Sequence, residues 1–279
     1  RVSAGGGMMN WRLSEIQRAV GGAQAGPDQT IAGVSTDTRS IGAGQLFVAL
    51  RGDRFDGHDF LEQAIAAGAG ALLVAEAARV PVGASALIVA DTRMALGRMA
   101  AAWRARFEIP VIAVTGSNGK TTTKEMIAAI LRCAFGDTVL VTRGNLNNDI
   151  GLPLTLLGLD SGHQAAVIEM GMNHPGEIGY LASLGAPTVA VVTNAQRAHL
   201  EGMGDLNQVA REKGRIFAGL AADGVAVVNA DDGYAYLWRE MAGSHSVRTY
   251  GIERAADVRA TVRQQGLTAL LSLEAAEGR

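Results

Sequence analysis

The sequence predicts an α/β fold in two parts, a small mixed α/β domain followed by a doubly wound parallel sheet. Three observations predict it. After residue 110, short apolar runs alternate regularly with longer helical patterns, as they do in parallel sheets covered by helices. Glu108-Ile109-Pro110 interrupts a helical run just before that alternation begins. Hydrophobic residues make up 48% of the 279 residues, which readily supplies a sizeable core.

The first region, which we place at residues 9–108, mixes short strands and helices. Apolar runs bounded by turn residues predict the strands, and amphipathic patterns predict the helices. The expected strands are Gln45–Leu50, Ala71–Ala75 and Ala86–Ala90, and the expected helices are Phe60–Ala67 and Met94–Arg106.

The second region, residues 109–279, carries the regular alternation. Its expected strands are Val111–Thr115, Thr138–Thr142, Ala165–Met170, Thr188–Thr193, Val225–Asn229 and Val247–Tyr250. The expected helices are Lys120–Ala134, Ile150–Leu157, Gly176–Leu184, Asn207–Leu220 and Asp232–Met241. Ligands of such sheets bind beyond the carboxyl ends of the strands. Polar residues follow five successive strands here, so we expect a site along that rim.

Composition excludes several classes of function. A net charge of -2 and a pI near 6.2 offer no basic field for nucleic acid. No apolar run reaches the ~18 residues of a membrane span. The single cysteine, Cys133, lies in an apolar helical pattern, and we expect it in the core of a cytoplasmic protein. Residues 1–8 lack the apolar centre of a signal peptide and look like a tag remnant.

A glycine loop joins the first strand of the second region to a helix. Gly116 and Gly119 let backbone N–H groups turn toward phosphate oxygens, and the helix N-terminus adds favourable partial charge. Lys120 can neutralise the β- and γ-phosphates, and the Thr121 hydroxyl is placed to bind Mg²⁺. Only Ser117 and Asn118 separate the glycines, so the loop is shorter than the common P-loop. We expect an ATP–Mg²⁺ site here.

Three further residues are candidates for the same rim. Glu169 ends an apolar strand, where a carboxylate could hold a cation that bridges phosphates, although a strand-end acid can also be merely solvated. His199 follows the next strand and could be a second ligand or an ordinary loop histidine. Lys213 is one of only three lysines among 25 basic residues, which favours a specific role over an exposed helix lysine.

Together these residues resemble the Mur ligase family of ATP-dependent amide ligases. The matching motifs are Thr115-Gly-Ser-Asn-Gly-Lys-Thr-Thr122, Glu169, His199, Lys213 and Asn229-Ala-Asp-Asp232. The resemblance implies a UDP-sugar domain, a central ATPase domain, and a third domain that receives the amino compound. We expect the third domain to be absent and the central domain to be incomplete at its C-terminal end.

The resemblance also implies a substrate. Segments Gly144–Pro153 and Glu169–Ile178 are similar to the family member that adds D-alanyl-D-alanine to UDP-N-acetylmuramoyl-tripeptide in peptidoglycan synthesis for the cell wall. Two polar loops are similar to the family's UDP-contacting segments, although such clusters are often only turns. The residues implied to contact the UDP-sugar are Ser35, Asp37, Thr38, Arg39, Asp56, Gly57 and His58.

The mechanism that the resemblance implies is carboxylate activation. The substrate carboxylate attacks the γ-phosphate to give an acyl phosphate, and the D-alanyl-D-alanine amine then displaces phosphate. Lys120, Glu169, His199 and Lys213 are the implied catalytic residues; Thr121, Glu169, His199 and a carbamylated Lys213 are the implied Mg²⁺ ligands. The implied nucleotide contacts are Gly116, Ser117, Asn118, Gly119, Lys120, Thr121, Thr122, Asn148 and Asn229.

Two alternatives remain beside a monomeric cytoplasmic ligase. Another ligase of this type, such as folylpolyglutamate synthase, shares the ATPase core but begins close to its phosphate loop, whereas about a hundred residues precede the loop here. The other alternative is a nucleotide-binding fragment without turnover. The sequence alone does not choose lysine or diaminopimelate as the third residue of the tripeptide.

Overall fold

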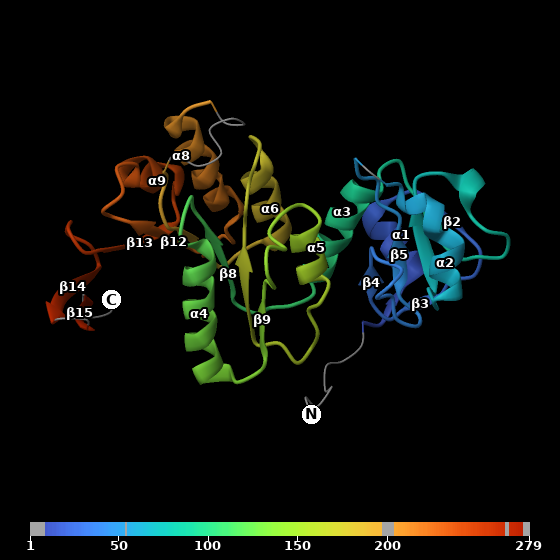
Figure 1. The fold of residues 1–279 in the computed structure, drawn as a ribbon, viewed down its shortest axis with the longest axis horizontal. Coiled ribbons are helices and arrows are strands. Elements are labelled where there is room, and N and C mark those ends of the chain that lie inside the picture. Colours follow the sequence, from blue (N-terminus) through green and yellow to red (C-terminus); the bar gives the residue numbers. More distant parts are fainter. Residues whose placement is uncertain (1–8, 54, 197–203, 266–267, 276–279) are drawn as a thin grey trace. The chain divides into compact units, whose positions relative to one another are not determined.

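A computed structural model gives the fold of the chain (Figure 1). The residues that the structure describes are 9–53, 55–196, 204–265 and 268–275. None of the helices in those ranges combines the length and the hydropathy that a bilayer-spanning helix needs.

The chain divides into two compact units, with a boundary between Glu108 and Ile109. One segment of the later sequence, residues 149–163, groups with the first unit instead of the second. This segment contains the helix α5, Gly151–Leu156, which packs on the helix α3, Thr92–Arg104. The second unit therefore consists of residues 109–148 and 164–279.

The first unit is built on a five-stranded sheet in the order β2-β7-β6-β5-β4. Strands β4 to β7 are parallel and β2 is antiparallel to β7. The strands are β2 Ala23–Ala25, β4 Val34–Ser35, β5 Leu46–Val48, β6 Ala71–Val74 and β7 Ala86–Ile88, and a separate antiparallel pair joins β1 Trp11–Arg12 to β3 Thr30–Ile31. The helices are α1 Leu13–Val20, α2 Leu61–Ala66 and α3, with 3-10 turns at Gly57–Phe60 and Ala77–Arg79.

The apolar runs expected in this unit form its core. Phe47, Leu61, Leu72 and Val74 pack together from β5, α2 and β6. The helix α3 begins where Asp91 accepts the backbone N–H groups of the first turn, which satisfies donors that a helix start otherwise leaves free. The elements before residue 45 were not expected from the sequence.

The second unit contains an eight-stranded sheet in the order β15-β14-β13-β12-β11-β8-β10-β9. All neighbours are parallel except β14 and β15, which form an antiparallel hairpin. The strands are β8 Val111–Thr115, β9 Val139–Val141, β10 Ala165–Glu169, β11 Val189–Val192, β12 Val225–Asn229, β13 Ser246–Gly251, β14 Val258–Gln265 and β15 Thr268–Ala275. The helices are α4 Lys120–Phe135, α6 Glu177–Gly185, α8 Leu206–Gly214 and α9 Ala235–Met241, and α8 continues into a 3-10 segment, Arg215–Gly219.

Helices cover both faces of this sheet, as a doubly wound fold requires. Ala128 of α4 packs with Val167 of β10. The next residue along that strand, Ile168, approaches Gly185 of α6, where an added Cβ would lie 2.7 Å from the Ile168 Cδ1 atom. Successive side chains of a strand point to opposite faces, so α4 and α6 lie on different sides of the sheet. The predicted fold class is confirmed.

The strand order places a topological switch at β8. From β8 the chain moves to the edge strand β9, returns to β10 beside β8, and then crosses to β11 on the other side of β8. Open α/β sheets bind ligands at the carboxyl ends of the strands at such a point. The glycine loop after β8 lies there.

The expectation that Cys133 is a core residue was wrong. Cys133 is exposed on α4, on a side of the helix that also exposes the apolar residues Met126 and Ile130. An apolar residue in a helical pattern therefore did not identify the buried side of this helix. The buried residues of α4 are Lys124 and Ala128, and the partly buried Ile127, Leu131 and Phe135 pack against the same core.

Candidate functional site

The glycine loop between β8 and α4 has a backbone that only glycine fits at its first position. Gly116 has a φ of 154°, and a Cβ added there would lie 1.8 Å from the Thr193 Oγ1 atom. Gly119 has a φ of 76° in the left-handed region and is the N-cap of α4. Together they direct the chain from the buried strand into the first turn of the helix.

Lys120, the first residue of α4, folds back over the loop. Its Nζ donates to the Gly116 carbonyl at 2.8 Å and to the Ser117 carbonyl at 3.2 Å. Burial lowers the pKa of Lys120, and the charge of Glu169 acts in the opposite direction. The Lys120 ammonium group thus lies against the glycine loop, close enough to Glu169, a predicted metal ligand, to be influenced by its charge.

Ser117 and Asn118, both predicted to contact the nucleotide, brace the loop in this structure. The Ser117 N–H donates to the Asn194 carbonyl at 3.0 Å, and the Asn118 N–H donates to Asn194 Oδ1 at 2.9 Å. The Asn118 side-chain amide also donates to Gln196 Oε1 at 2.6 Å. These contacts connect the loop to the segment that follows β11.

Glu169, at the end of β10, is 2% exposed and is held at both carboxylate oxygens. The Thr121 hydroxyl donates to Oε2 at 2.9 Å, and the Asn147 amide donates to Oε1 at 2.9 Å. The structure therefore brings together Lys120, Thr121 and Glu169, three residues that the sequence placed at one site.

Asn147 was not predicted; the predicted nucleotide contact was its neighbour Asn148, which is exposed. Close packing fixes Asn147. The Gly171 N–H donates to its carbonyl, and a Cβ at Gly171 would lie 2.9 Å from its side chain. Two adjacent asparagines gave no signal to separate them, since the chain direction after β9 decides which one faces Glu169.

Lys213, in the last turn of α8, is 2% exposed. Its pKa is lowered to about 7, chiefly by burial and also by the charge of Lys120, while the charge of Glu212 acts in the opposite direction. A buried lysine with this pKa has a large neutral fraction near pH 7. His199, the remaining predicted ligand, lies outside the described residues.

Asn229, a predicted nucleotide contact at the end of β12, is engaged with the backbone. Its amide donates to the Thr193 carbonyl at 2.9 Å, and its Oδ1 accepts the Asp231 N–H at 3.0 Å. Asp232 accepts the Ala195 N–H at 2.9 Å. These bonds tie the ends of β11 and β12 together. Thr122 is exposed in the first turn of α4.

A cavity of about 450 Å³ lies in the first unit beside the predicted UDP-sugar residues. Its lining includes Asp37, Thr38, Arg39 and Gly57 from the predicted set, together with Thr36, Phe47, Phe55, Phe60 and Gln63. Arg39 donates to both oxygens of Asp37, and these bonds lower the pKa of Asp37 to about 2. Ser35 supports the same loop by accepting the Asp37 N–H at 3.1 Å.

Two aromatic residues of this cavity lie in a loop that the resemblance matched to a UDP-contacting segment, but they were not among the residues predicted to contact the UDP-sugar. Phe55 is 61% exposed and Phe60 is 40% exposed, so both offer ring surface to a ligand. They flank the Asp56-Gly57-His58 motif that was singled out, and large apolar residues in a polar loop are the signal that could have identified them.

Asp56 and His58, also predicted UDP-sugar residues, contact each other and are not among the residues that line this cavity; His58 is buried and Asp56 is partly exposed. The His58 Nδ1 lies 2.6 Å from Asp56 Oδ1, and His58 Nε2 accepts the Ala75 N–H at 2.9 Å. His58 therefore donates its Nδ1 proton to Asp56. Arg51 and Arg79 also contact Asp56. Burial raises the pKa of Asp56, but the hydrogen bonds from the His58 N–H, the His58 ring and Arg51 outweigh it, so the pKa lies below the usual range.

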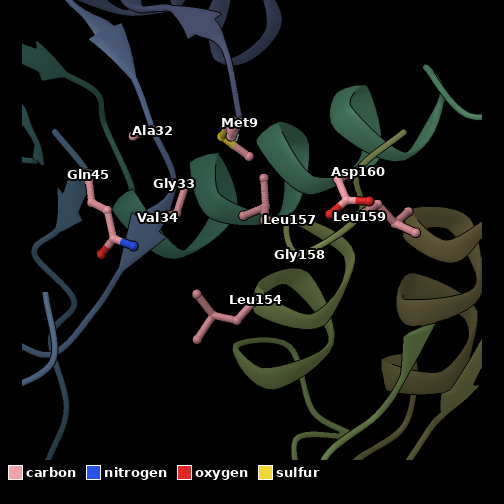
Figure 2. Close-up of a pocket in the computed structure, with 10 residues that line it drawn as sticks. All are labelled: Met9, Ala32, Gly33, Val34, Gln45, Leu154, Leu157, Gly158, Leu159 and Asp160. Atoms are coloured by element: carbon pink, nitrogen blue, oxygen red, sulfur yellow. The ribbon is translucent and has the colours of Figure 1, made fainter. Parts of the chain in front are cut away.

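A second hollow of the first unit has a volume of about 250 Å³ (Figure 2). Leu154 and Leu157 of the α5 segment contribute to it. Its acidic residue, Asp160, is already bonded to the Gly162 N–H at 2.8 Å and to His163 at 2.9 Å. None of the predicted site residues lines it.

The oxygen ligands near the glycine loop suit a hard cation whose coordination shell is completed by phosphate oxygens. Thr121 and Glu169 present oxygen atoms, which Mg²⁺ prefers. Among the described residues there is no group of three or more His, Cys, Asp or Glu side chains that could hold a metal. The protein therefore offers a partial coordination shell, as phosphate-bridging Mg²⁺ sites do.

Comparisons with known proteins point to one family. The model described as "Mur ligase middle domain" matches residues 114–275, and the model "Mur ligase family, catalytic domain" matches residues 30–104. The chain is 49% identical over 241 residues to the UDP-N-acetylmuramoyl-tripeptide--D-alanyl-D-alanine ligase of Escherichia coli. That alignment covers 86% of this chain and 52% of the relative, so the chain spans about half the length of the curated relatives it matches.

Solved structures agree. A crystal structure of MurF from Acinetobacter baumannii superimposes with a TM-score of 0.90 at 38% identity, covering 98% of this chain and 60% of that one. The MurF ligase of Thermotoga maritima in complex with ADP matches with a TM-score of 0.78 at 30% identity, covering 87% of this chain and 55% of that one.

Proposed function

The chain belongs to the Mur ligase family, and from that premise we propose that it supplies the ATP-binding and UDP-sugar-binding parts of a peptidoglycan ligase. The proposed reaction joins D-alanyl-D-alanine to UDP-N-acetylmuramoyl-tripeptide. The 49% identity to the Escherichia coli ligase supports the choice of substrate. The observation that carries the proposal is the contact of Thr121 with Glu169 at 2.9 Å directly after the glycine loop.

The residues of the loop fit ATP and Mg²⁺. The turn at Gly116 and Gly119 leads the backbone into the first turn of α4, whose N-terminus favours anions. Thr121 and Glu169 would hold the metal, and Lys120 would exchange its loop carbonyls for phosphate oxygens. Bound ATP would supply the phosphoryl group that makes the carboxylate oxygen a leaving group. Mg²⁺ would neutralise the negative charge of that phosphoryl group.

Lys213 is the residue that we propose to be carbamylated. Its neutral amine would add to CO₂, forming an N–C bond and releasing one proton, which gives an anionic oxygen ligand in place of a cation. The lowered pKa, about 7, supports this step because only the neutral amine reacts. Burial from solvent at 2% exposure would protect the product.

The 450 Å³ cavity of the first unit is the proposed uridine diphosphate site. The exposed rings of Phe55 and Phe60 can pack on the apolar face of uracil. The Thr38 hydroxyl offers a donor for the polar edge of uracil or for the phosphates. Asp56 and His58 fix the loop that carries the two rings, through their own contact with each other and through the bond of His58 to the Ala75 N–H.

Calorimetric titration with two ligands tests the proposal. UDP-N-acetylmuramoyl-tripeptide is expected to bind, and dihydrofolate, the substrate class of folylpolyglutamate synthase, is not. A Phe55→Ser variant should weaken the binding of UDP-N-acetylmuramoyl-tripeptide. Binding of folate, or of neither ligand, would contradict the proposed substrate. Phosphate release in the presence of ATP, tripeptide substrate and D-alanyl-D-alanine separates a ligase from a module that binds without turnover.

A further inference from the structure

Lys124, the remaining one of the chain's three lysines, lies one helical turn beyond Lys120 and is not used by the proposed reaction. Its side chain is 1% exposed. The Nζ donates to the Thr142 carbonyl at 2.9 Å and lies 3.9 Å from Glu169 Oε2. The more exposed Glu125 is 3.0 Å away on the other side. A buried ammonium group thus stands beside the carboxylate that is proposed to hold Mg²⁺.

The position of Lys124 relative to Glu169 is fixed from both sides. Thr142, directly after β9, accepts the Lys124 ammonium with its carbonyl and the Glu169 N–H with its hydroxyl at 3.0 Å. Thr121 and Asn147 hold the carboxylate itself. Burying a cation is costly, and here the Thr142 carbonyl and the carboxylates of Glu125 and Glu169 offset that cost.

We propose that Lys124 is a positioning residue that serves as an internal counter-cation to Glu169 and prevents free divalent cations from binding before the nucleotide. This inference rests on the proposed Mg²⁺ site. Because of the Lys124 charge, Mg²⁺ would bind at Glu169 only together with the phosphates of the nucleotide, and it would leave with them.

Charge and ligand number support the assignment. A dication at Glu169 would be repelled by the ammonium 3.9 Å from the same carboxylate oxygen, and the repulsion is weakly screened because both groups are buried. Lys120 contributes a second positive charge to the field at Glu169. Thr121 and Glu169 offer too few ligands to overcome this repulsion, whereas the oxygens and negative charge of a bound polyphosphate supply both ligands and attraction.

Binding of Mn²⁺ to the nucleotide-free protein, followed by electron paramagnetic resonance, tests the inference. Lys124→Met removes the charge and keeps an apolar stem, and Lys124→Gln also keeps a donor for Thr142. Both variants are expected to bind Mn²⁺ at least about tenfold more tightly than the wild type. The exposed Arg132 on the same helix provides the control, because Arg132→Met removes one positive charge away from the cluster.

The outcomes separate this inference from the proposed function. The Glu169→Gln substitution should abolish the Mn²⁺ binding gained by Lys124→Met, and should weaken Mn²⁺ binding to the wild type in the presence of ADP. Unchanged Mn²⁺ affinity in both Lys124 variants overturns the inference, as does wild-type Mn²⁺ binding that is as tight without nucleotide as with ADP and that Glu169→Gln removes. If neither variant folds, that wild-type measurement decides. Insensitivity to Glu169→Gln in the presence of ADP refutes the metal site itself.

Discussion

Replacing Lys213 with methionine is expected to stabilise the protein while removing the amine that carbamylation needs. The pKa of Lys213 in the folded protein is about 7, against an ordinary value of 10.5, chiefly because the side chain is buried. A pKa difference of one corresponds to about 1.4 kcal/mol, so the charged form costs on the order of 5 kcal/mol below pH 7. Methionine avoids this cost but packs imperfectly, and we expect a gain of about 2 to 4 kcal/mol at pH 6.

The gain should depend on pH in a defined direction. Between pH 7 and pH 10.5 the unfolded wild type holds a proton on Lys213 that the folded protein has released. The free energy of unfolding of the wild type therefore rises with pH across that window. The advantage of the variant is largest below pH 7 and should fall by more than half between pH 6 and pH 9.

Urea unfolding at pH 6, 7, 8 and 9 in carbonate-free buffer measures this advantage, because carbonate would allow carbamylation to stabilise the wild type. Arg211→Met, an exposed change on the same helix, is the control and should shift stability by less than about 0.5 kcal/mol at every pH. A Lys213→Met variant that is less stable than the wild type at pH 6, or whose advantage does not change with pH, would refute a buried, largely neutral Lys213.

Three further substitutions test the site. Gly116→Ala forces a Cβ against Thr193 and should weaken ADP binding at least about tenfold in calorimetry; unchanged affinity would show that the loop geometry is not needed. Asn147→Leu removes a donor to Glu169 and should raise the Mg²⁺ concentration that ADP binding requires by about tenfold. If Asn147 only fills space, a Mg²⁺ titration of ADP binding would show no shift. Phe60→Ser should weaken UDP binding by about fivefold with little change in thermal stability, since the ring is 40% exposed; equal loss of both would indicate a structural role instead.

The centre of the candidate site was predictable because a general rule located it. Strand ends of a parallel sheet share one rim, so Lys120, Thr121 and Glu169 could be assigned together from their places after β8 and β10. Asn147 was not predictable, because its contact with Glu169 depends on the path of an irregular loop. Lysine is rare in this chain, which drew attention to its few positions. The burial of Lys124 could not be inferred, because the exposed side of its helix is apolar and the pattern therefore does not show which side faces the sheet.

The fold shows the same division. Strands β8 to β13 of the second unit were expected within one or two residues, because buried parallel strands give long apolar runs. The antiparallel hairpin of β14 and β15 was not expected. The strands before residue 45 have only two or three residues each, too few to show a period. The grouping of α5 with the first unit depends on packing against α3, which local sequence patterns do not encode.

Calorimetric titration of ADP into the wild type and into Glu169→Gln, with and without Mg²⁺, tests the nucleotide site most directly. We expect Mg²⁺ to tighten ADP binding to the wild type at least about tenfold and to have little effect on the variant, because Glu169 supplies the protein's carboxylate ligand. Equal Mg²⁺ enhancement in both proteins, or no ADP binding to the wild type, would contradict the assignment of Thr121 and Glu169 to the metal.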